Sequence, residues 1–180
     1  MAAAAILVWD PFVRMFHWGL VLSFAIAWVS SENPGTLHEL AGYAAVGLVV
    51  ARVGWGLVGE RYARFSQFVR SPAAIAEYLK AIAAGSEPRY LGHNPAGGAM
   101  IVVLLCAMAA TAISGWLLTT DAYWGSTGMQ RLHSLLADAL LLLVLAHLGG
   151  VALASLRHHE NLVRAMVTGL KRPAGPADVA

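Results

Sequence analysis

Four long apolar stretches limit what this chain can fold into. They cover residues 12–30, 37–58, 96–120 and 130–156 and hold few charged side chains. A helix of about 20 residues spans the hydrocarbon of a bilayer. With 58% hydrophobic residues, 12% charged residues and a mean hydropathy of +0.64, the chain is too apolar for a soluble domain of 180 residues. The sequence therefore predicts an all-α membrane protein, a bundle of four transmembrane helices.

The basic residues outside these stretches predict the orientation of the bundle. They gather in the loop of residues 59–95 and in the segment after the last stretch, whereas the two opposite loops offer only Arg131. Positively charged loops stay on the cytoplasmic side. We therefore expect both termini and the 59–95 loop in the cytoplasm, with residues 31–36 and 121–129 on the opposite side. The net charge of +2 then belongs to a rim along the inner leaflet, not to a nucleic-acid surface.

The remaining segments add little to a single-domain organisation. Residues 72–84 carry an amphipathic helical pattern, which predicts an interfacial cytoplasmic helix or a helix folded against the bundle. The last residues, 173–180, are rich in Pro, Gly and Ala, so we expect a disordered tail there. Residues 1–172 are predicted to form one domain.

Histidines recur at matching depths of the apolar stretches. His133 and His147 are 14 positions apart in one stretch, and His17 and His38 stand near the start of the first two. A helix rises about 1.5 Å and turns about 100° per residue, so His133 and His147 point within roughly 40° of one face and lie about 21 Å apart. Because successive helices alternate in direction, His38 shares the outer depth of His133. By the same argument, His17 shares the inner depth of His147.

Each pair of histidines suits one haem iron. Two axial imidazoles saturate the iron, which favours electron transfer and leaves no position for oxygen or a substrate. Since no C-x-x-C-H motif occurs, the predicted cofactors are two b haems. Two alternatives stay open from the residues alone. A single intramembrane histidine often hydrogen bonds a neighbouring helix, and zinc or copper also binds histidine, although neither pair has a nearby Cys or carboxylate to complete a zinc site.

Three arginines are candidates to meet the haem propionates, which need cations at depths where charge is costly. Arg14 lies one turn before His17, and Arg52 lies at the same inner depth, so both are candidates for the inner haem. Arg131 is the candidate for the outer haem. For Arg52, snorkelling to the inner interface is the alternative.

Gly42 and Asp138 are further candidates near the outer haem. Gly42 follows His38 by one turn and leaves room for a flat ring, or for close packing of helices. Asp138 lies about 140° around the helix from His133, so we expect it not to touch the same ring. It is predicted either to exchange protons with a quinone or to make a structural hydrogen bond.

Short motifs along the chain carry a resemblance to a known family. They are VWDPFVRMFHW at 8–18, RVGWG at 52–56 with ARF at 63–65, LGHNP at 91–95, SGW at 114–116 and RHHENL at 157–162. With these motifs, over about residues 6–172, the chain resembles the bacterial cytochrome b561 family. These are small di-haem membrane cytochromes, and they include the cytochrome subunits of nickel-iron hydrogenases.

The resemblance implies a multi-pass protein of the bacterial inner membrane whose two b haems pass electrons between the quinone pool and a redox partner. The positions that match the family's haem ligands are His17, His38, His133 and His147. Family members differ in what they serve: some resemble superoxide-quinone oxidoreductases, some anchor hydrogenases, and many work with soluble c-type cytochromes.

The choice between conduit and enzyme depends on charge at the outer face. Outer loops with only Arg131 against Glu32 and Asp121 give little positive potential to steer an anion such as superoxide. We therefore expect an electron conduit to a partner such as a periplasmic c-type cytochrome. A superoxide-quinone oxidoreductase, a membrane anchor of a hydrogenase-like complex and a non-redox transporter or scaffold are the alternatives, and the sequence leaves open whether the chain is itself an enzyme.

Overall fold

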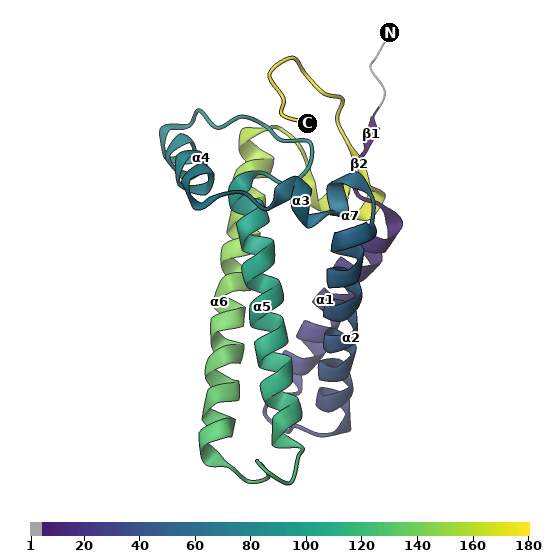
Figure 1. Cartoon of the computed structure of the whole chain (residues 1–180), viewed down its shortest axis with the longest axis vertical. Helices are drawn as coiled ribbons and strands as arrows, with labels where there is room; N and C mark the ends of the chain where they lie inside the picture. Colours follow the sequence, from purple (N-terminus) through teal and green to yellow (C-terminus); the bar gives the residue numbers. More distant parts are fainter. Residues whose placement is uncertain (1–4) are drawn as a thin grey trace. The chain divides into compact units, whose positions relative to one another are not determined.

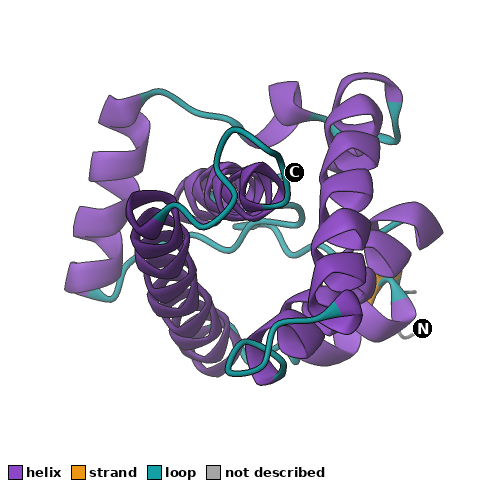
Figure 2. Ribbon diagram, turned by 90° about the horizontal axis from the view of Figure 1, so that it is seen from below, coloured by secondary structure: helices purple, strands orange, loops and turns teal. Residues whose placement is uncertain are grey.

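Helices dominate the computed structural model, which describes residues 5–180 (Figures 1 and 2). The long helices are α1 (Pro11–Val29), α2 (Thr36–Val58), α5 (Pro95–Leu118) and α6 (Thr127–Arg157). All four are long and apolar enough to cross a membrane. The prediction of an all-α membrane protein with four transmembrane helices is therefore confirmed.

Short elements connect or flank the long helices. They are β1 (Ile6–Leu7), the 3-10 helix η1 (Arg61–Ala63), α3 (Phe65–Phe68), α4 (Pro72–Ala84), α7 (Leu162–Thr168) and β2 (Leu170–Lys171). β1 pairs antiparallel with β2, so the segment before α1 lies beside the segment after α7. Local capping explains where several helices begin: Asp10 Oδ1 accepts a hydrogen bond of 2.9 Å from the Val13 N–H at the start of α1. The other carboxylate oxygen of Asp10 accepts from the indole of Trp55 in α2, at 3.2 Å.

The chain forms two compact units. The first consists of Met1–Arg14, Gly54–Val102 and Ala146–Ala180, and the second of Met15–Val53 and Val103–Leu145. Each long helix contributes residues to both units. The first unit holds the segments that we predict to be cytoplasmic, and the second holds the two connections predicted on the opposite side.

Part of the apolar face of helix α4 is buried within the first unit. The Tyr78 side chain is buried, its hydroxyl donates to the Pro88 carbonyl at 3.4 Å, and its ring meets that of Tyr90 edge-on. Burial and the neighbouring Glu87 raise the pKa of Tyr78 to about 12. Leu79, the next residue of α4, is 51% exposed. Contact of this exposed part with the membrane surface stays a prediction.

A buried ion network holds the C-terminal segment in the first unit. The Arg89 side chain, only 4% exposed, pairs with Glu160 at 2.6 Å and also with Asp178. The Val179 N–H donates to the Arg89 carbonyl at 2.8 Å. We expected residues 173–180 to be a disordered tail, and the structure differs because Asp178 supplies a counter-charge to a guanidinium that is already buried.

The charges of this network lower the pKa values of its acids. Burial raises the pKa of Glu160, but hydrogen bonds from Arg89 and the charge of Lys171, 3.3 Å away, outweigh it and bring that pKa below 4.5. The Gly175 N–H, and after it Arg89, lower the pKa of Asp178 against the effect of its burial. A carboxylate with a lower pKa in the folded state contributes stability above its unfolded pKa, and this is lost as pH falls through the folded value. The first unit is therefore expected to loosen in acid, at pH values below 4.5.

Replacing Arg89 with methionine is expected to destabilise the protein by about 3–5 kcal/mol, because removing one partner of a buried ion pair leaves the other charge without compensation. Thermal unfolding in detergent at neutral pH measures the effect. Lys80→Met, on the exposed side of α4, is the matched control. The difference between the two variants should shrink at acid pH, where Glu160 and Asp178 become protonated. Equal unfolding temperatures at neutral pH would show that the network adds no stability.

Candidate functional site

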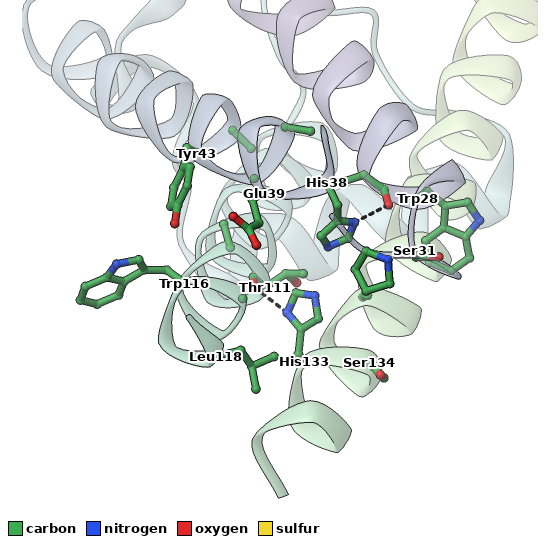
Figure 3. A pocket seen from close by; sticks show the side chains of 18 of the residues that line it. Trp28, Ser31, His38, Glu39, Tyr43, Thr111, Trp116, Leu118, His133 and Ser134 are labelled. Atoms are coloured by element: carbon green, nitrogen blue, oxygen red, sulfur yellow. Dashed lines mark hydrogen bonds between the residues drawn. The ribbon is translucent and has the colours of Figure 1, made fainter. Parts of the chain in front are cut away.

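The second unit contains a pocket of about 700 Å³, within the usual range for ligand sites. Residues of all four long helices line it, most of them apolar or small. His38 of α2 and His133 of α6 project into it side by side, and neutral polar groups such as Thr111 and Ser134 lie around them (Figure 3).

The two histidine rings are spaced as two ligands of one metal ion would be. Their centroids are 6.1 Å apart and their planes meet at 76°. Bonds from a metal ion to imidazole nitrogen are about 2.0–2.1 Å long, and a five-membered ring with bonds of about 1.33 Å has a radius of about 1.1 Å. Two rings on opposite sides of one ion therefore have centroids about 6.3 Å apart. The observed separation fits this arrangement.

Hydrogen bonds at the other ring nitrogens select the metal-binding form of both histidines. His38 Nδ1 lies 2.9 Å from the Ala27 carbonyl of α1, and His133 Nδ1 lies 3.0 Å from the Thr111 carbonyl of α5. A carbonyl oxygen only accepts hydrogen bonds, so Nδ1 carries the proton in each ring. The Nε2 lone pairs are then left for a metal, and such a backbone anchor is usual for metal-ligating histidine. His133 Nδ1 has a second contact, because Ser114 Oγ also lies 3.0 Å from it.

Two glycines provide space at this pair. A Cβ atom on Gly115 would lie 3.0 Å from Cε1 of His133, so the ring rests against the α5 backbone. Gly42, one turn after His38, lines the pocket, and a Cβ atom there would meet nothing within 4 Å. The space beside Gly42 can take a flat ligand next to the histidines. The side chains present therefore fit a haem between His38 and His133.

The described residues offer no set of ligands that would suit zinc. Within residues 5–180, no group of three or more His, Cys, Asp or Glu side chains is placed to hold a metal ion. Zinc sites draw three or four ligands from the protein. A pair of histidines beside a large apolar pocket suits haem better.

The residues that orient His133 were not among the predicted site residues. Ser114 and Gly115 were noted only as part of the SGW motif at 114–116, and no role was predicted for Thr111. One signal was available: Ser114 is a polar residue in a helix without charged side chains, and a buried hydroxyl needs a hydrogen-bond partner. The Ala27 carbonyl of α1 could not be found from side-chain types.

Two predicted residues of the outer side lie differently with respect to the pocket, and their roles toward a haem stay predictions. Asp138, expected not to touch the same haem ring as His133, lines the same pocket as His133. The reason is that Gln130, Ser134 and Asp138 follow one another at intervals of four, so the lining covers a wide helix face and not a narrow line. Arg131, predicted to meet the outer propionates, is exposed and lies outside the lining, because it follows Gln130 by about 100°.

The inner-side candidates are divided between the two units. In the second unit, His17 of α1 is half-buried, and the Arg52 side chain is buried at 2% exposure with its guanidinium 5.9 Å from the centroid of a phenylalanine ring of α1. This burial does not fit the snorkelling alternative for Arg52. In the first unit, His147 of α6 is half-buried, and Arg14 donates to a backbone carbonyl of α7 at 2.7 Å. Their assignment to an inner haem stays a prediction.

Comparison with known proteins supports a haem protein of the membrane. A family model described as prokaryotic cytochrome b561 matches residues 8–169. Searches of curated proteins and of solved structures give no match. The family match, which spans most of the chain, implies b-type haem and electron transfer in a multi-pass membrane protein. The chain belongs to the prokaryotic cytochrome b561 family.

Proposed function

We propose that this cytochrome carries electrons across the membrane through two b haems, each held by two histidines. The ligands are His38 and His133 for the outer haem and His17 and His147 for the inner haem. The separation of 6.1 Å between the rings of His38 and His133 is the observation that supports this proposal best. For His17 and His147 the support comes from the sequence, through the 14-residue spacing along α6 and the matching depth on α1.

The residues of the pocket perform three tasks in this function. Haem, when bound, supplies reversible one-electron chemistry. His38 and His133 would hold the iron, the Ala27 and Thr111 carbonyls keep both rings in the ligating form, and the apolar lining excludes water. An iron held by two histidines would have no free position for a substrate, so electrons would pass through an exposed edge to a docked partner or a diffusible carrier. This favours an electron conduit.

We also propose that the first unit faces the cytoplasm, as the distribution of basic residues suggests. In a Cys106→Ala background, Ser126→Cys should be labelled by an impermeant thiol reagent added to spheroplasts, because residue 126 lies between α5 and α6. Ala84→Cys, at the end of α4, should be labelled only after lysis. The reverse pattern would invert the topology.

The partner of the conduit is proposed to be a periplasmic c-type cytochrome, and the electron donor a quinol. In membranes, quinol is expected to reduce both haems, and reoxidation should stay slow until a soluble c-type cytochrome is added. Stopped-flow absorbance measures both steps. Asp138, which lines the pocket, is proposed to exchange protons with the quinone, so Asp138→Asn should slow reduction without changing the haem content.

The same measurement tests the alternative of a superoxide-quinone oxidoreductase. No Arg or Lys lines the pocket among the described residues, whereas Glu39 and Asp138 do. An anion is therefore not attracted to this site. Superoxide is expected to react slowly if the protein is only a conduit. A rate of haem oxidation or reduction by superoxide near the diffusion limit of about 10⁸–10⁹ M⁻¹s⁻¹, measured without a protein partner, would favour the oxidoreductase over the electron conduit. Stable copurification with a hydrogenase-like subunit would instead favour the membrane-anchor role.

A further inference from the structure

We propose that Ser114 is a positioning residue which, with two backbone carbonyls, holds the rings of His38 and His133 nearly perpendicular to each other. The proposal rests on the proposed ligation of the outer haem by these histidines. The two ring planes meet at 76°. The relative orientation of two axial imidazoles affects the electronic state of a haem iron, so this angle has a measurable consequence.

Each ring plane is set by a different helix. The Nδ1–H bond lies in the plane of its ring, and a hydrogen bond weakens steeply when it is far from linear. His38 Nδ1–H points to the Ala27 carbonyl of α1, whereas His133 Nδ1–H points to the Thr111 carbonyl of α5. Both carbonyls belong to helix backbone and cannot follow a rotating side chain, so the direction of each Nδ1–H bond is set independently of the other ring. His38 has a second contact in Ser30 Oγ, 3.4 Å from its Nδ1.

Ser114 adds the second contact that His133 needs. Its side chain is buried, its hydroxyl donates to the Thr111 carbonyl at 2.8 Å, and its oxygen lies 3.0 Å from His133 Nδ1. Because the hydroxyl proton is used on the carbonyl, an oxygen lone pair is left for the Nδ1–H group. One acceptor lets the ring pivot about its N–H direction, whereas two acceptors define its plane. The backbone at Gly115 also approaches the ring closely, since a Cβ atom added there would lie 3.0 Å from Cε1 of His133.

The perpendicular arrangement predicts a distinct spectroscopic signature. An axial imidazole donates π density into the iron d orbital that is perpendicular to its own plane. Parallel rings raise one orbital of the pair and split the two levels, whereas perpendicular rings raise both and keep them nearly equal in energy. A nearly equal pair gives a strongly anisotropic low-spin signal in electron paramagnetic resonance. His38 and His133 should therefore confer such a signal on the oxidised outer haem.

The test compares the oxidised, full-length protein with its variants after the haem of each has been counted. The wild type should show the strongly anisotropic signal, and this signal should vanish in His133→Ala. In Ser114→Ala it should be replaced by a rhombic low-spin signal with a smaller largest g value, while Ser114→Thr keeps the wild-type signal. Thr120→Ala is the matched control, since that hydroxyl donates to the Leu117 carbonyl at 2.6 Å and Thr120 is not part of the pocket lining.

The outcomes separate this proposal from the proposed function. A wild type without the anisotropic signal, or a Ser114→Ala signal identical to wild type, overturns the positioning role even if two haems are present. If Ser114→Ala loses the outer haem, Ser114→Thr decides: retention of the anisotropic signal supports the role and a rhombic signal overturns it. A haem count that does not change in His133→Ala overturns the ligation itself.

Discussion

Replacing His133 with alanine is expected to remove one of the two proposed b haems and to leave the other in place. An iron that loses the His133 imidazole would keep a single protein bond, to His38, and among the described residues that line the pocket Met108 is the only other one with a sulfur or imidazole ligand. His147→Ala is expected to remove the other haem, because it lies about 21 Å further along α6. The pyridine haemochrome spectrum, divided by protein concentration, gives the count.

A histidine with no predicted ligand role provides the control for this experiment. His159→Asn suits it, since His159 is exposed and has a positive φ of 48°, which asparagine also adopts. This variant should keep both haems. If His133→Ala and His147→Ala also kept both, the assignment of ligands to α6 would be wrong. Loss of both haems in either single variant would show that the two sites do not bind independently.

Filling the space beside Gly42 is expected to lower the haem content about as much as His133→Ala does. In Gly42→Leu, the new side chain meets no protein atom within 4 Å at its Cβ and extends into the pocket beside His38. The helix itself becomes more stable, because glycine is about 0.8–1.0 kcal/mol less favourable than alanine inside a helix and leucine ranks just below alanine. The fold should therefore persist while the outer haem is displaced, so that the haem count falls to that of His133→Ala.

Gly47→Leu is the matched control for Gly42→Leu. Gly47 lies on the same helix, also has nothing within 4 Å of its Cβ position, and is not part of the pocket lining. It should keep both haems. Circular dichroism and thermal unfolding check that both variants are folded. Equal haem contents in the two variants would mean that no haem lies beside Gly42.

The helices and the outer histidine pair could be predicted because each depends on local regularities of the sequence. Apolar stretches of sufficient length must become helices in a bilayer, since every backbone polar group has to be satisfied within the segment. The fixed rise and rotation of a helix then convert positions in the chain into depths, which assigns His38 and His133 to one level. Their rings indeed lie 6.1 Å apart.

What the sequence did not predict depends on contacts between distant segments. The pairing of Arg89 with Glu160 and Asp178 joins residues that are 71 and 89 positions apart, and no local pattern marks such partners. The angle between His133 and Asp138 around α6 could be derived from the sequence, but the width of the pocket could not. The sequence therefore did not predict that Asp138 lines the pocket. The acceptors of both histidines are backbone carbonyls, which every residue carries and no residue type reveals.

The pairing of β1 with β2 has a consequence for how the protein is made. Residues Ile6–Leu7 leave the ribosome before the four long helices, but their partner strand, Leu170–Lys171, emerges after them. Arg89 likewise can form its ion pair with Asp178 only after residue 178 has been synthesised. Segments of a chain normally fold in the order in which they are translated. The first unit can therefore close only after all four long helices have been synthesised, and until then its early segments stay accessible to chaperones and proteases.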